Sequence, residues 1–298
     1  MVKGRIRILC CLFVAAAHMT AQLSEFPTLT GPYLGQKLPD KGPLVFAPGL
    51  VSNGANASSP AIAPDGHEIY WDVDKIWFTK LEKGRWTKPE LVPFNQGDRH
   101  LYRVPCFSPD GQRLYFLSTR PGSVSQDKEN IWYAERTSSG WSDPKPLSPR
   151  VNALRIHWNI SVSGAGTVYF QGTRPDQSDS GGIYYSRLDK GEHAEPVRMG
   201  PEINSPGAMT TCPYVAPDES FLVFNSLRRS PEDSGIFISF SDGPGRWRQA
   251  VRLIGGSREI GGLSPRLSPD GKYLFYVNEN VFWMPIAKLI DELRPKDR

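Results

Sequence analysis

The sequence predicts an all-β protein, a single β-propeller with five four-stranded blades. The main observation is a unit of short apolar runs that recurs five times along the 298 residues, at a spacing of about 45 to 55 residues that is typical of propellers. The last unit lacks a fourth strand, and a matching run, PLVFAPG, stands near the amino end at 43–49. An N-terminal strand would therefore close the ring and remove its exposed edges. Six blades would need a repeat that the sequence does not show.

The second repeat shows the unit most clearly. Its first three predicted strands cover 104–108, 113–117 and 131–134, and the first ends in Ser-Pro-Asp-Gly, a typical tight-turn sequence. The second and third are rich in aliphatic and aromatic residues and too short for helices. A fourth strand follows a Gly140-Trp141 turn and runs to Leu147. Pro144 places that strand at an edge, because proline cannot donate to a ladder.

Two markers identify the other repeats. The turn recurs at 64–66, 163–166, 217–219 and 269–271, although the third repeat has Gly-Ala-Gly in it. The fourth-strand marker is Trp86, Trp141 and Trp247, with His193 in the third repeat. We expect the tryptophans to pack between blades, and the aspartates of the turns to shape the turns and not to act as catalytic acids; these are Asp65, Asp110 and Asp270.

The chain divides into a signal peptide at 1–21, an N-terminal extension at 22–42, the propeller at 43–286 and a C-terminal tail at 287–298. The first segment has three cations before a short apolar run, ILCCLFVAAA, and small residues near Ala21, as in cleaved secretory signals. Cys10 and Cys11 lack the context of a lipoprotein signal. We expect a periplasmic or secreted protein, a monomer, with no membrane span after cleavage.

Charge and cysteine content limit the possible partners. Three of the net +4 charges lie before residue 21, so the mature chain is nearly neutral and a nucleic-acid partner is not expected. Cys106 and Cys212 lie on the first strands of repeats that are not neighbours in a ring, whereas a disulfide needs Cα atoms within about 7 Å. We therefore expect two buried free thiols, and no cofactor.

Three segments, SPDGQRLYFLSTR, APDESFLVFNSLR and SPDGKYLFY, resemble the TolB-like, WD-type propeller repeats of exported bacterial proteins. The resemblance covers roughly 43–286. It implies a periplasmic propeller that binds a protein, peptide or glycan, and it carries no catalytic set. TolB also has a separate amino-terminal α/β domain, which this chain lacks, so a role in the Tol–Pal system is not implied.

The candidate ligand site lies in loops expected on one face of the ring. Guanidinium groups match carboxylates or sulfates, and aromatic rings offer stacking faces. The hypothesis is a binding module for an anionic peptide, glycan or protein partner; the alternative is that each repeated arginine stabilises its own blade. The ligand-binding candidates are Tyr102, Arg103, Arg120, His157, Trp158, Arg174 and Arg228.

An enzyme is the main rival function. Five-bladed propellers include glycoside hydrolases, which need two carboxyl groups about 5 to 10 Å apart. The five first-strand windows contain no acid, and the loop acids Asp98, Glu202 and Glu259 have no evident partner. We therefore expect no enzymatic activity, unless two acids meet at the channel mouth. Asp176 and Asp179 depart from the spacing of a calcium loop, so no metal site is expected. An envelope scaffold with an exposed apolar patch stays a second alternative.

Overall fold

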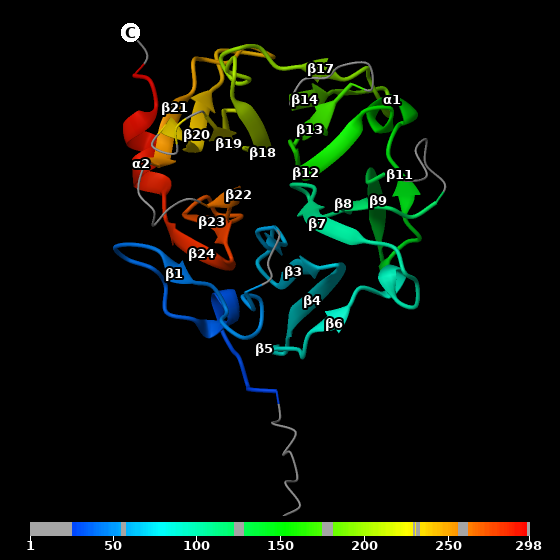
Figure 1. The fold of residues 1–298 in the computed structure, drawn as a ribbon. Coiled ribbons are helices and arrows are strands. Elements are labelled where there is room, and N and C mark those ends of the chain that lie inside the picture. Colours follow the sequence, from blue (N-terminus) through cyan, green and yellow to red (C-terminus); the bar gives the residue numbers. More distant parts are fainter. Residues whose placement is uncertain are drawn as a thin grey trace, which may run out of the picture.

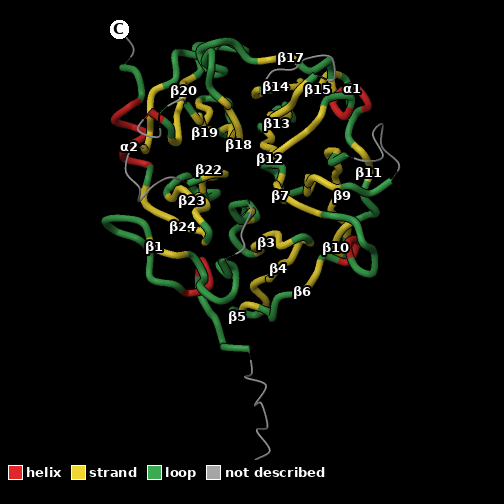
Figure 2. Tube along the Cα trace, in the orientation of Figure 1, coloured by secondary structure: helices red, strands yellow, loops and turns green. Residues whose placement is uncertain are grey.

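The computed structural model describes residues 26–54, 58–121, 128–174, 181–228, 230, 233–255 and 262–296. Within these residues the chain forms five antiparallel blade sheets and one small two-stranded ribbon, and the blades are arranged in a ring (Figures 1 and 2). Cavities lie among the first strands at the centre of the ring, which we call the channel. The predicted five-bladed propeller is confirmed. The predicted signal peptide lies outside the described residues and stays a prediction.

The sheets follow one another along the chain. Blade 1 contains β2 (Ala61–Ile62), β3 (Glu68–Val73), β4 (Lys75–Glu82), β5 (Arg85–Trp86) and β6 (Glu90–Leu91). Blade 2 contains β7 (Tyr102–Phe107), β8 (Arg113–Ser118), β9 (Asn130–Thr137), β10 (Gly140–Trp141) and β11 (Lys145–Pro146). Blade 3 contains β12 (Arg155–Val162), β13 (Val168–Thr173), β14 (Gly182–Ser186) and β17 (Val197–Arg198), with the ribbon β15 (Leu188–Asp189) and β16 (Glu192–His193).

Blade 4 contains β18 (Met209–Val215), β19 (Phe221–Leu227), β20 (Gly235–Phe240) and β21 (Val251–Gly255). Blade 5 contains β22 (Leu263–Leu267), β23 (Tyr273–Asn278), β24 (Asn280–Pro285) and the N-terminal β1 (Leu44–Val45). Short helices lie outside the sheets: η1 (Pro32–Gly35), η2 (Pro93–Asn95), α1 (Pro149–Asn152) and α2 (Ala287–Leu293).

The N-terminal strand closes the ring as the sequence predicts. Leu44 of β1 lies opposite Trp283 of β24, and the Phe46 backbone N–H donates to the Val281 carbonyl at 2.8 Å. The Phe46 ring is fully buried, in edge-to-face contact with Phe275 at 5.1 Å between ring centroids. First and last blades are therefore joined by backbone pairing and by aromatic packing.

The innermost strands share an irregularity that positions the channel mouth. Four of them shift register against their second strand, and each shift contains a residue with a positive φ at the same place, with Trp158 as a second one in blade 3. Such a β-bulge re-aims side chains and often lies beside a functional site. The residues with positive φ occupy equivalent places in blades 2 to 5 and all border the channel: Val104, Asn159, Cys212 and Ser264.

Packing between blades follows the predicted tryptophans. Trp141 meets Tyr70 of blade 1 edge to face at 6.4 Å, and Trp247 meets Tyr169 of blade 3 at 6.3 Å. Cys106 and Cys212 are buried free thiols, as expected. No helix among the described residues is both long and apolar enough to span a bilayer.

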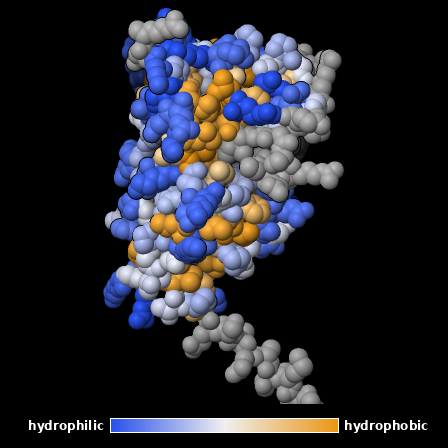
Figure 3. All heavy atoms as spheres, turned by 90° about the vertical axis from the view of Figure 1, so that its left-hand side faces the viewer, coloured by the Kyte–Doolittle hydropathy of each residue, from blue (hydrophilic) through white to orange (hydrophobic). Residues whose placement is uncertain are grey.

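The side of the ring that carries α2 and β1 has a band of apolar surface between charged side chains (Figure 3). Leu44 and Val251, on β1 and β21, are among the exposed apolar residues, at 40% and 43% exposure. An exposed apolar surface is what the scaffold alternative predicts. That alternative therefore stays open.

Candidate functional site

A cavity of about 130 Å³ lies at one mouth of the channel. Its polar wall combines a cation, an acid, an amide and two hydroxyls, and Trp158 stands at its edge with 48% of its surface exposed. The polar residues come from all blades but the fourth, which contributes the thiol of Cys212. They are Ser58, Arg103, Glu129, Asn159 and Ser264.

A buried carboxyl group supports this wall from behind. Asp72, near the end of β3, is 1% exposed, accepts a hydrogen bond from the Ser58 hydroxyl, and interacts with the backbone N–H of Val104. Its second oxygen, Oδ2, has no hydrogen-bond partner among the described residues. Burial raises the pKa of Asp72, although these bonds and the charges of Arg103 and Arg266 act in the opposite direction.

Glu129, just before β9, supplies the acid that lines the cavity. Burial raises its pKa, the positive charge of Arg103 opposes the rise, and the negative charge of Asp72 adds to it. Arg103 Nη1 lies 4.0 Å from Glu129 Oε1, while its Nη2 lies 3.1 Å from Asp74 Oδ1. Two carboxyl groups with raised pKa therefore influence each other at the channel mouth, an arrangement often found at functional sites.

Arg266 lines a second cavity of about 180 Å³ and is bonded to Asn159, which lines the first. Its guanidinium is buried and donates to the Pro105 carbonyl at 2.7 Å and to Asn159 Oδ1 at 3.2 Å. Asn159 in turn donates to Ser264 Oγ at 3.2 Å. Blades 2, 3 and 5 are thus tied across the channel, and the mouth has a polar floor.

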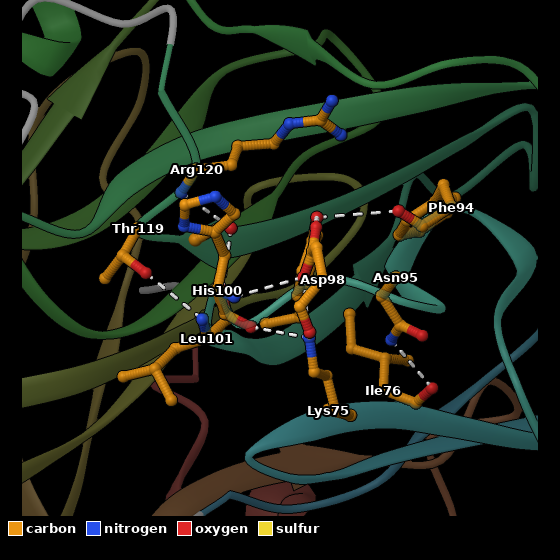
Figure 4. A network of polar contacts seen from close by, with 11 residues as sticks. Lys75, Ile76, Phe94, Asn95, Asp98, His100, Leu101, Thr119 and Arg120 are labelled. Carbon is orange, nitrogen blue, oxygen red and sulfur yellow. Dashed lines mark hydrogen bonds and ion pairs between the residues drawn. The ribbon is translucent and has the colours of Figure 1, made fainter.

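Among the predicted site residues, Arg103 and Trp158 line this cavity. Tyr102 instead lies buried beside it, where its hydroxyl donates to Asp98 Oδ2 at 2.6 Å. Figure 4 shows the polar network around Asp98, Lys75 and His100. Lys75 pairs with Asp98 at 2.7 Å. Burial alone would raise the pKa of Asp98, but the bonds from Lys75, Tyr102 and the His100 backbone outweigh it and lower the pKa. Asp98 is therefore an ionised structural acid.

The repeated arginines do not converge on the cavity. The Arg120 guanidinium lies over the Trp132 ring at 5.0 Å, and that of Arg228 lies over Phe237 at 4.4 Å, each within its own blade. Arg174 follows β13 and is partly buried. The contacts of Arg120 and Arg228 agree with the alternative that each repeated arginine stabilises its own blade. A ligand-binding role for Arg120, Arg174 and Arg228 stays a prediction.

Several sequence-based candidates cannot be placed. The side chain of His157 lies outside the described part of the structure, as do Asp176, Asp179 and Glu259. Glu202 is described, but it is not among the residues that line the mouth cavity. Within the described residues, no three His, Cys, Asp or Glu side chains come together as metal ligands.

Asp72 and Glu129 were missed because the sequence search for acids covered first strands and selected loops. Strand pairing aligns Asp72 with uncharged residues at the same second-strand position of the other blades: Leu117, Gln171, Asn225 and Val277. Asp72 is the charged residue at this second-strand position, and that difference between the repeats could have identified it as a candidate site residue.

No family model matches the chain, and no curated protein matches it either. Among solved structures, TolB from Acinetobacter baumannii aligns with 17% identity and a TM-score of 0.47, covering 76% of this chain and 53% of TolB. The chain thus spans about half the length of TolB.

Two enzymes align over nearly their whole length. The gluconolactonase XC5397 from Xanthomonas campestris gives a TM-score of 0.50 at 13% identity, covering 87% of this chain and 94% of the enzyme. A thermostable family-43 glycoside hydrolase gives 0.50 at 13% identity, covering 78% and 91%.

These neighbours correct the expectation that the protein is not an enzyme. That expectation relied on a propeller without an evident acid pair, but known enzymes have this fold, and at the mouth the charge of Asp72 acts on Glu129. The chain is a five-bladed propeller with structural neighbours that include TolB and enzymes.

Proposed function

We propose that the channel mouth binds a neutral, hydroxyl-rich ligand, of which a glycan is the natural class. The observation that carries this proposal is the cavity wall, in which Ser58, Glu129 and Asn159 offer hydrogen-bonding groups beside the exposed ring of Trp158. Sugars present hydroxyls at their edges and apolar C–H faces that stack on aromatic rings. A small polar cavity with an aromatic edge suits both features.

The charge of the mouth favours a neutral ligand over an anionic one. Arg103, the lining cation, already contacts Asp74 and Glu129, and Asp72 lies directly behind the wall. Arg120 and Arg228, which would have supplied further positive charge, stack on rings of their own blades. Uronic-acid and sulfated glycans and acidic peptides therefore serve as comparison ligands.

Acid-catalysed cleavage of the bound glycan is the second candidate function. Glu129 lines the cavity and has a raised pKa, so it stays protonated at higher pH than an ordinary glutamate. That property suits a general acid, which gives its proton to the leaving oxygen, while water adds to the anomeric carbon and returns a proton to the Glu129 carboxylate. Asp72 would act as a positioning residue, because its charge helps to keep Glu129 protonated. The fold is compatible with this chemistry, since a family-43 glycoside hydrolase shares it.

Binding is tested by calorimetric titration of the protein with neutral, uronic-acid and sulfated oligosaccharides and an acidic peptide. We expect a neutral oligosaccharide to bind best, and Trp158→Ala to weaken binding about threefold to tenfold through loss of stacking. Glu82→Gln, which changes an exposed acid on blade 1, is the matched control. The proposal fails if no saccharide binds or if Trp158→Ala binds like the wild type.

Cleavage is tested on the same saccharides by release of new reducing ends. Glu129→Gln should lower the rate about 100-fold or more, the usual contribution of a general acid, while the affinity changes little. The rate of the wild type should fall only at a pH above the ordinary glutamate range, because the acid must remain protonated. Tight binding without cleavage would reject the acid role of Glu129 and leave the binding proposal standing.

A further inference from the structure

The second cavity, which Arg266 lines, lies farther along the channel than the mouth cavity. In every blade, the first-strand residues that line it come after those that line the mouth cavity. First strands run in the same direction from blade to blade in a propeller, so the two cavities lie toward opposite ends of the channel. Apolar side chains from all five blades form much of its wall, among them Ile62, Pro109, Val162, Pro217 and Leu267.

Arg266 brings a buried positive charge to this cavity. The residue is 7% exposed, and its two hydrogen bonds go to neutral oxygens, the Pro105 carbonyl and Asn159 Oδ1. None of the ion pairs among the described residues involves Arg266. A guanidinium stays charged in a protein, and a buried charge without an opposite charge beside it is costly. Arg266 therefore lacks an anion.

One N–H of Arg266 is open toward the second cavity. Its Nε has no hydrogen bond within the described part of the chain, and it is not among the unpartnered polar atoms that are closed off from solvent. Arg266 borders the second cavity and does not border the mouth cavity. The accessible N–H therefore faces the second cavity.

Tyr214 of blade 4 adds a hydroxyl to the same wall. This hydroxyl also has no hydrogen bond within the described residues and is not closed off from solvent. Burial raises the pKa of Tyr214, and the charge of Arg266 opposes the rise, so the hydroxyl lies within the field of the guanidinium. The Cys106 thiol, which borders the cavity as well, responds in the same way. A cation and a hydroxyl thus meet beside an apolar wall.

The size of the cavity limits what it can hold. An apolar cavity of about 150 Å³ is large enough for a benzene molecule. At about 180 Å³, the second cavity has room for one ring, or for a short branched chain, with a carboxylate attached. A peptide chain or an oligosaccharide is too large for it. Carboxylate oxygens accept hydrogen bonds from guanidinium N–H groups and hydroxyls, and these bonds are strengthened by charge.

We propose that the second cavity binds a small monocarboxylic acid with an apolar ring or short chain, whose carboxylate accepts hydrogen bonds from Arg266 Nε and the Tyr214 hydroxyl. The carboxylate supplies the negative charge that Arg266 lacks, and the apolar body lies against the prolines and aliphatic side chains of the wall. The alternative is that Arg266 only ties the blades together, with Asp72, whose pKa its charge lowers, as a distant counter-charge. The cavity would then not distinguish an acid from a neutral molecule of the same shape.

The probe is 4-fluorobenzoate, titrated into the wild-type protein and followed by fluorine NMR. 4-Fluorobenzamide has nearly the same shape without the charge and is the matched control. We expect the acid to bind at least about tenfold more tightly than the amide, because hydrogen bonds to charged groups are the stronger ones. Equal affinities, or no binding of the acid, would overturn the proposal without any change to the protein.

Two variants place the site. Arg103→Gln removes the cation of the mouth cavity and should leave the affinity for the acid within about twofold of the wild type. Arg266→Gln keeps a donor but removes the charge, so the acid should bind it no better than the amide does. If Arg266→Gln does not fold, Tyr214→Phe removes only the hydroxyl and should weaken binding of the acid about twofold to tenfold.

Unchanged affinity for the acid in whichever of the Arg266 and Tyr214 variants folds contradicts the proposal. Loss of binding in Arg103→Gln contradicts it too, because the acid would then occupy the channel mouth.

Discussion

Asp72 and Asn225 occupy equivalent positions in blades 1 and 4 and do the same structural work. Asn225 Oδ1 accepts the backbone N–H of Ser264 at 2.9 Å, and Asp72 interacts with the equivalent N–H of Val104 in the next blade. A neutral amide is therefore enough to hold the bulge. The buried carboxyl group of Asp72, whose pKa burial raises, is an addition that costs stability once the pH is high enough to ionise it, and such a cost is typical of functional sites.

Replacing Asp72 with asparagine should stabilise the protein at neutral pH. Because the folded-state pKa of Asp72 is raised, the folded protein holds this proton more tightly than the unfolded chain does. As pH rises above about 4, the unfolded value, the unfolded chain ionises at this residue before the folded protein does, so stability falls until the folded pKa is passed. Urea unfolding should show Asp72→Asn more stable than the wild type by about 1 kcal/mol at pH 7, with little difference below pH of about 4.

Asp74→Asn is the control for this prediction, because Asp74 lies two residues away and its side chain is 71% exposed. Its effect should stay within about 0.5 kcal/mol at both pH values. A wild type more stable than Asp72→Asn at pH 7 would mean that Arg103 and Arg266 fully compensate the buried charge.

The repeated arginines after the second strands, Arg120, Arg174 and Arg228, show what sequence repetition can and cannot predict about an element. The sequence analysis kept the alternative that each of these arginines stabilises its own blade. A residue that recurs at one position of a repeat often has the same structural role in each copy. The β-bulges of the inner strands could not be predicted in this way. Val104, Asn159, Cys212 and Ser264 share a positive φ but no side-chain chemistry, and the one repeated mark, a proline after three of them, restricts the backbone without specifying a positive φ.

Arg120→Ala and Arg228→Ala should each destabilise the protein by about 0.5 to 2 kcal/mol, through loss of the cation–π contact with Trp132 or Phe237. Glycan affinity at the mouth should stay within about twofold of the wild type, because neither residue borders the cavity. Urea unfolding and calorimetric titration of the same variants check the two effects. A tenfold loss of affinity with unchanged stability would instead give these arginines the ligand-binding role that the sequence suggested.

At the scale of the whole molecule, the sequence predicted the five-bladed ring but not the set of residues that meet at the channel mouth. The number of blades and the closing strand follow from the repeat, because each blade must bury its faces against its neighbours. The mouth combines Asp72 from blade 1, Glu129 from blade 2 and Asn159 from blade 3, and no repeat taken alone indicates that these side chains meet. Their proximity depends on the diameter of the ring and on the bulges, which are properties of the assembled fold.

Ring closure makes the N-terminal strand part of the cooperative structure. Phe46 is fully buried against Phe275 and Trp283, with ring centroids at 5.1 and 5.3 Å, whereas Leu44 on the same short segment is 40% exposed. Phe46→Ala should therefore lower the free energy of unfolding by about 3 to 5 kcal/mol, and Leu44→Ala should lower it by less than about 1 kcal/mol.

Circular dichroism and tryptophan fluorescence should report one shared transition at a lower urea midpoint for Phe46→Ala, because the tryptophans, which are present in all five blades, depend on the same closed ring. Two separate transitions would show that blade 5 opens alone and that closure protects only its own edge. An unchanged urea midpoint would show that the N-terminal strand does not belong to the cooperative unit. The propeller would then be stabilised by packing between neighbouring blades.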